Sequence, residues 1–114
     1  MRESNMNEWI RELHGQKDQI TQICDKIENG QAYMAELRSF LPAMNQMITG
    51  ILNLAGDPDV ALDLNTEFVI QVLKDIIYGI ENEDSVFLLD VLRYGLQEIY
   101  EYIETEVGGG AADE

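Results

Sequence analysis

Residues 82–103 read NEDSVFLLDVLRYGLQEIYEYI, and this stretch decides the fold. An α-helix advances about 100° per residue, so apolar residues within about 60° of Leu92 share one face. Its other members are Leu88, Leu89, Leu96, Ile99 and Ile103. A second apolar stripe, roughly 130° away by the same spacing, consists of Phe87, Val91 and Tyr94. Residues 85–106 are therefore predicted to form a helix with more apolar surface than a single core face needs.

Working outward, helical periodicity predicts three more helices, over residues 5–29, 31–55 and 66–80. The helix over 66–80 has an apolar stripe covering about half its circumference, which indicates burial against more than one neighbour. Four amphipathic helices with mostly short connections predict an all-α fold, an antiparallel bundle of about four helices. The alternative is a long hairpin from the first half docked on a compact helix pair from the second.

Two positions are expected to disturb these helices. Pro42 should kink the second helix rather than end it, because the apolar register continues past it. The first helix is predicted to be weakened or bent near Gly15, since Gln16 and Lys17 fall where its apolar stripe should continue.

Turn residues mark where the helices begin and end. Gly30 can adopt the left-handed conformation that ends a helix, and residues 56–65 form the clearest loop. Asn65 and Asp84 are the expected N-caps of the third and fourth helices. Residues 1–107 are thus predicted to form a single helical-bundle domain, followed by a disordered tail over residues 108–114.

Charge is concentrated in the second half of the chain. The sequence has 22 acidic and 7 basic residues, a net charge of −15. Residues 56–114 hold 15 of the acids and only Lys74 and Arg93 as bases, a net charge of −13. This surface repels phosphate backbones and anionic lipids, so we expect neither a nucleic-acid nor a membrane partner.

No motif for chemistry emerges, so we expect no catalytic residue, no metal site and no cofactor. Asp57, Asp59 and Asp63 resemble part of a calcium loop, but Leu62 and Phe68 stand where glycine and glutamate are needed. The single histidine, residue 14, gives no zinc spacing and is expected at the surface.

The single cysteine, Cys24, allows no intramolecular disulfide and lies on an apolar stripe, so it is expected to be buried. No apolar leader or membrane-length run is present, and a cytoplasmic location is expected.

Two sets of residues suggest packing details. Met34, Met44 and Met47 give the second helix flexible apolar side chains that suit either a core or a binding surface. Three glycines fall within or at the end of predicted helices, where they can let helices approach closely: Gly50, Gly79 and Gly95.

Residues 80–96, IENEDSVFLLDVLRYGL, resemble a short motif of uncharacterised acidic helical proteins from Gram-positive bacteria. The matching positions are Asn82, Asp84, Leu88, Leu89, Asp90, Leu92 and Tyr94. The sequence departs from the motif at Gly95, where an acidic residue is expected. This resemblance implies a bacterial cytoplasmic protein and no particular activity.

Tyr100 and Glu104 also resemble the Tyr-x-x-x-Glu tail of small helical-hairpin secretion substrates, although the central Trp-x-Gly turn of those proteins is missing.

These features favour a non-enzymatic protein–protein interaction module, an adaptor or chaperone-like bundle that self-associates as a homodimer or binds another protein. Its candidate interface is the second stripe, Phe87, Val91 and Tyr94, whose other interpretation is packing inside the bundle. The alternatives are a small-ligand-binding or enzymatic helical bundle, and a secreted helical-hairpin effector.

Overall fold

The computed structural model describes the backbone of residues 2–108 and the side chains of residues 6–107. Within this range the chain forms helices and turns, with no strand, which confirms the predicted all-α class. Three α-helices come first: α1 (Arg2–Glu28), α2 (Met34–Ala55) and α3 (Thr66–Glu81). A last long helix has four consecutive segments: α4 (Ser85–Val91), the π-helical η1 (Leu92–Leu96), α5 (Gln97–Ile103) and the π-helical η2 (Glu104–Gly108).

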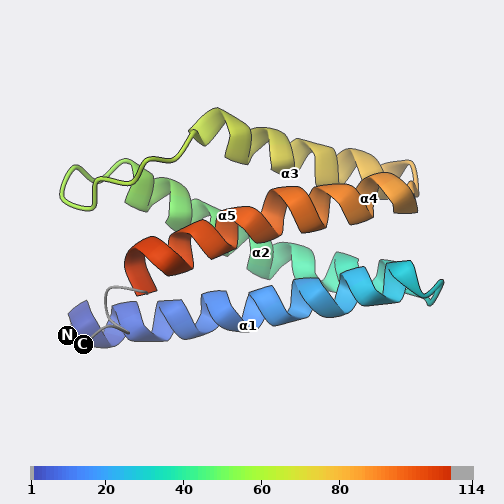
Figure 1. The fold of residues 1–114 in the computed structure, drawn as a ribbon, viewed down its shortest axis with the longest axis horizontal. Coiled ribbons are helices and arrows are strands. Elements are labelled where there is room, and N and C mark those ends of the chain that lie inside the picture. Colours follow the sequence, from blue (N-terminus) through green and yellow to red (C-terminus); the bar gives the residue numbers. More distant parts are fainter. Residues whose placement is uncertain (1, 109–114) are drawn as a thin grey trace.

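The four long helices form a bundle in which sequence neighbours run in opposite directions (Figure 1). In that view the last helix lies between α1 and α3, and α2 lies behind it. Contacts between early and late positions of adjacent helices agree with these directions. They pair Trp9 with Gly50, Lys17 with Glu104, Glu28 with Arg93, and Gly79 with Leu88.

The core runs along the centre of this bundle and draws on every long helix. The last helix contributes the face centred on Leu92, as predicted, except that Leu89 is only partly buried. Helix α3 buries Val69, Val72, Ile76 and Ile80. Burial of apolar side chains from all four helices supplies the main driving force for folding.

The two expected disturbances leave their helices unbroken. Helix α2 continues through Pro42 as a single helix, so the proline does not end it, and the kink expected there stays a prediction. Helix α1 is continuous through Gly15, and the weakening or bend expected there stays a prediction. The polar side chain of Gln16 is buried with hydrogen-bond partners. Gln16 Oε1 accepts a hydrogen bond from the Tyr100 hydroxyl at 2.6 Å, and its Nε2 donates to the Ala43 carbonyl at 3.2 Å.

The predicted capping residues are confirmed, although α2 begins at Met34 rather than at residue 31. Gly30 has a φ of +69°, in the left-handed region, where it follows α1. Asn65 Oδ1 accepts hydrogen bonds from the backbone N–H groups of Glu67 and Phe68. Asp84 Oδ1 accepts one from Phe87 N at 3.1 Å. Each cap satisfies donors that a helix N-terminus leaves without intrahelical partners.

The last helix departs from the regular helix predicted over residues 85–106. Its η1 and η2 segments have π-helical hydrogen bonding, and such segments locally change the angular spacing of side chains. Gly95 lies in η1, where a Cβ atom would come within 3.1 Å of Val72 Cγ2. The predicted tail over residues 108–114 lies outside the described residues, apart from Gly108 at the end of η2.

Candidate contact surface

The structure separates the three residues predicted to form the interface. Val91 is buried, with 8% of its surface exposed, and belongs to the core. Phe87 is half-buried, whereas Tyr94 is 60% exposed. The reason is that α3 packs against this flank of α4, with Gly79 of α3 facing Leu88 and Phe87. Phe87 and Tyr94 are therefore the members of the stripe that reach the surface.

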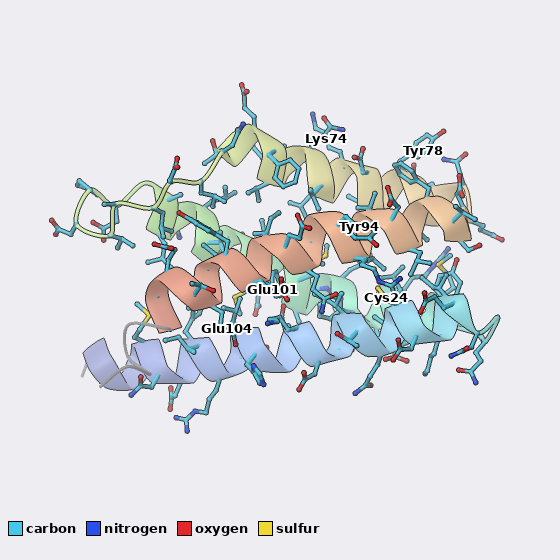
Figure 2. All side chains as sticks on the ribbon, in the orientation of Figure 1. Cys24, Lys74, Tyr78, Tyr94, Glu101 and Glu104 are labelled. Atoms are coloured by element: carbon cyan, nitrogen blue, oxygen red, sulfur yellow. The ribbon has the colours of Figure 1, made fainter. Side chains whose placement is uncertain are left out.

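Tyr78, which sequence analysis did not select, joins these two residues. Its ring meets the Phe87 ring edge-on, with centroids 5.7 Å apart and an interplanar angle of 81°. Tyr78 remains 56% exposed and projects from α3, while Tyr94 projects from the last helix (Figure 2). Tyr78 and Phe87 are on different helices, so periodicity within one helix could not reveal the pair.

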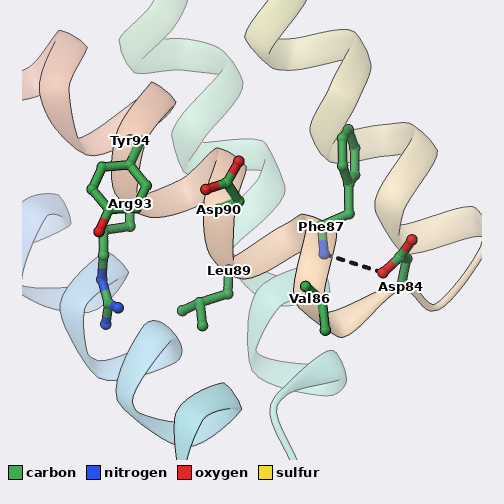
Figure 3. A pocket seen from close by; sticks show the side chains of 7 residues that line it. All are labelled: Asp84, Val86, Phe87, Leu89, Asp90, Arg93 and Tyr94. Carbon is green, nitrogen blue, oxygen red and sulfur yellow. Dashed lines mark hydrogen bonds between the residues drawn. The ribbon is translucent and has the colours of Figure 1, made fainter.

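Beside these aromatic residues lies an open hollow of about 510 Å³ on the outer side of α4 and η1 (Figure 3). Its lining residues are Asp84, Val86, Phe87, Leu89, Asp90, Arg93 and Tyr94. In Figure 3, Phe87 points toward α3 and Arg93 points toward α1. Val86 is 78% exposed, so the hollow combines an aliphatic and two aromatic side chains at the surface.

The charged groups of the hollow are unbalanced. Arg93 is its only base, and its guanidinium donates a hydrogen bond to Glu28 Oε2 of α1 at 2.9 Å. That hydrogen bond lowers the pKa of Glu28. Asp84 and Asp90 both line the hollow and are exposed. With Arg93 already paired, the hollow presents a net negative charge.

A second, smaller hollow of about 250 Å³ lies between α1 and α2. Gln16 lines it together with Trp9, Glu12, Ala43, Gln46 and Met47. The Gln16 amide is engaged on both sides, since its Nε2 also donates to Glu12 Oε2 at 3.0 Å. Among the described residues no buried side-chain nitrogen or oxygen lacks a hydrogen-bond partner. This hollow therefore offers no unsatisfied buried group to a ligand.

The remaining candidates for chemistry lie apart from one another. Cys24 is buried in the core, and this burial raises the pKa of its thiol. Asp57 Oδ1 accepts a hydrogen bond from Asp59 N, as in a simple turn. In the part of the chain that the structure describes, no three histidine, cysteine or acidic side chains are grouped to hold a metal ion. Over the same residues, no helix is both long and apolar enough to cross a membrane.

The methionines divide between core and surface. Met44 and Met47 are buried, and Met34 is partly buried at the start of α2. Gly50 allows close approach as predicted, since a Cβ atom there would lie 3.0 Å from Trp9 Nε1. Gly50 thus lets Trp9 of α1 lie close to α2, and the three methionines contribute mainly to the core.

His14 lies at the surface, as predicted, in a group of charged side chains that joins α1 to the end of the last helix. Lys17 Nζ lies 2.8 Å from Glu104 Oε1 and 3.8 Å from Glu101 Oε2. His14 Nδ1 lies 2.8 Å from Glu104 Oε2. Figure 2 shows Glu101 and Glu104 on the side of the last helix that faces α1. The hydrogen bond from Lys17 is the main cause of a lowered pKa at Glu104.

Comparison of the chain with models of known protein families, with curated proteins and with solved structures finds no match.

Proposed function

We propose that the protein is a non-enzymatic binding module that contacts another protein through Tyr78, Val86, Phe87 and Tyr94, the contact face. The observation that carries this proposal is that this face keeps two tyrosines and a valine more than half exposed, beside an open hollow. Exposed apolar patches bordered by polar residues are typical of protein-binding sites. Tyrosine is also enriched among the residues that dominate binding energy.

Helix α3 offers a matched control for this face. Its Ile70 and Ile77 are 42% and 47% exposed and, with Leu73, follow the spacing of one helical stripe. By the 100° spacing, that stripe lies on the flank of α3 away from Gly79, which faces Leu88. Exposed isoleucines there can be replaced without altering the contact face.

Selection of binding peptides from an unbiased displayed library tests the proposal. We expect peptides to be enriched whose affinity falls at least about tenfold for Tyr78→Ser/Tyr94→Ser, because anchor residues each contribute more than about 1 kcal/mol. The control Ile70→Ser/Ile77→Ser should retain binding. Failure to enrich any peptide, or an equal loss of peptide affinity in the two variants, would count against the contact face as a binding site.

Self-association is a second candidate function, and the isoleucine stripe favours it. Lys74 lies beside this stripe on α3, so two copies could meet there without bringing the acids of the hollow together. Sedimentation velocity should then show a dimer that Ile70→Ser/Ile77→Ser converts to monomer and that Tyr78→Ser/Tyr94→Ser leaves intact. A monomer at all concentrations would remove this candidate and leave the binding proposal untouched.

A further inference from the structure

We infer that the occupant of the contact face is a basic amphipathic helix of a partner protein. This inference rests on the proposed function and specifies the chemistry of the partner. Two observations carry it. Exposed aromatic side chains lie beside the carboxylates of the hollow, and the one base that lines the hollow, Arg93, is already paired with Glu28.

Charge complementarity points to a basic partner. Asp84 and Asp90 line the hollow, and Glu81 and Glu83 are exposed in the adjoining end of α3 and the turn after it. Arg93 contributes little positive charge to an incoming chain because it is bound to Glu28. Lysine or arginine side chains on a partner would gain from these carboxylates and from the exposed tyrosine rings.

A second copy of this chain fits the contact face poorly. A symmetric dimer through this face would place the same patch on both sides of the interface. Asp84 and Asp90 of one copy would then approach their counterparts, and like charges facing each other are unfavourable. The net charge of −15 on each chain adds to this repulsion.

The form of the surface favours a helix as the occupant. Within the described residues there is no strand, so an extended peptide finds no sheet edge to extend. Val86, Phe87 and Asp90 of α4 and Tyr94 of η1 line the hollow from successive turns of the last helix. The hollow's volume of about 510 Å³ lies within the rough 300–1,000 Å³ range of natural ligand pockets, enough for more than one apolar anchor.

The test uses a model peptide of about 18 residues, or about five helical turns, with leucine at i, i+3, i+4 and i+7 spacing and lysine elsewhere. One control has every lysine replaced by glutamate, and another has the same composition scrambled. We expect saturable binding of the basic amphipathic peptide, with the largest amide NMR shifts at Val86, Asp90 and Tyr94. The scrambled peptide should bind at least about tenfold more weakly, and the acidic one not at all.

Matched variants separate local recognition from the overall charge. Asp84→Asn/Asp90→Asn should weaken binding about three- to tenfold, the range expected for two exposed ion pairs. Asparagine also caps helices, so α4 should remain intact. Asp18→Asn/Asp25→Asn removes the same charge from exposed positions on α1 and should change affinity less than about twofold.

Three results would overturn the inference. They are an equal loss of peptide affinity in the two double aspartate variants, equal affinity for the basic and the scrambled peptide, and amide shifts spread over the acidic surface. Its failure can be told apart from failure of the proposed function. If library peptides depend on Tyr78 and Tyr94 but are acidic or bind in extended form, the contact face stands and the basic helix is excluded.

Discussion

The last helix meets its two neighbours, α1 and α3, through different chemistry. Among the described residues, six polar side-chain pairs cross to α1: Tyr100 with Gln16, Gln97 with Thr21, Glu104 with Lys17 and with His14, Glu101 with Lys17, and Arg93 with Glu28. Toward α3 the described residues show no side-chain hydrogen bond or ion pair. Instead, Gly79 lies against Leu88, Gly95 lies against Val72, and Tyr78 meets Phe87 edge-on.

The difference bears on where a partner can bind. The polar pairs between α1 and the last helix fix the register of the two helices. The charged groups in these pairs already have partners within the chain. Close packing at the α3 boundary needs no such groups, and it leaves Tyr78 and Tyr94 directed outward. The contact face therefore lies beside the boundary that is held by packing alone.

The largest expected effect on the boundary between α1 and the last helix comes from removing its buried hydrogen bond, between Tyr100 and Gln16. Tyr100→Phe removes the hydroxyl that donates to Gln16 Oε1 and leaves that oxygen buried, which should cost about 2 kcal/mol of unfolding free energy. Tyr102→Phe is the matched control, since its hydroxyl accepts from Asp63 N at an exposed loop and should cost less than about 1 kcal/mol. Urea denaturation measures both. Equal losses would show that the buried position of Gln16 is unimportant.

A single added methyl group should disturb the close packing between α3 and α4. A Cβ atom at residue 79 would lie 2.7 Å from Leu88 Cγ and Cδ2, and Leu88 is fully buried. Overpacking exceeds the helix propensity that alanine gains, so Gly79→Ala should lower the unfolding free energy by about 1 kcal/mol.

Gly95→Ala is the comparison, because its nearest contact, Val72 Cγ2 at 3.1 Å, needs only a small shift. Its net effect should be within about 0.5 kcal/mol of zero, as the clash and the gain in propensity offset each other. A stable Gly79→Ala protein would mean that α3 can move away from α4 at little cost.

The ion pairs between α1 and the last helix should make a pH-dependent contribution to the unfolding free energy. The pKa of Glu104 is lowered from its usual 4.5 in the folded chain, mainly by the Lys17 hydrogen bond. Its contribution is therefore fully present above pH 4.5 and is lost as pH falls through the lower folded pKa. Near neutral pH, the unfolding free energy of the wild type should exceed that of Glu104→Gln by about 0.5 kcal/mol. The value is small because solvent screens this partly exposed ion pair.

Denaturation of the wild type and Glu104→Gln across pH 3–7 measures this difference, and the many other carboxylates cancel in the comparison. The difference should narrow below pH 4.5. A difference that grows as pH falls below 4.5 would contradict the assigned ion pair.

Local patterns were sufficient for the helices and their ends. Periodicity predicted the four long helices, and Asn65 and Asp84 were recognised as caps because a cap bonds within three residues of itself. The hydrogen bonds of Gln16 could not be predicted, since its partner Tyr100 is 84 residues away and no local pattern connects them. The π-helical segments were missed because they depend on packing between helices as well as on local sequence.

The candidate surface was only partly predictable for a related reason. Periodicity identified an apolar stripe on the last helix but could not tell which flank α3 would cover. As a result, Val91 was assigned to the interface although it is buried, and Tyr78 on α3 was overlooked. Recognising the pair of Tyr78 and Phe87 requires the antiparallel register of two helices, which the structure supplies.

The smallest expected effect distinguishes the surface and buried members of that stripe. Tyr94→Ser should change the unfolding free energy by no more than about 0.5 kcal/mol, because the side chain is 60% exposed. Val91→Ala, three residues earlier, should cost about 2 kcal/mol, since it removes buried methyl groups and leaves a cavity. Thermal and urea denaturation of the two variants measures this contrast. If Tyr94→Ser were as destabilising as Val91→Ala, Tyr94 would be part of the packing between α3 and the last helix, and the contact face would lose its more exposed tyrosine.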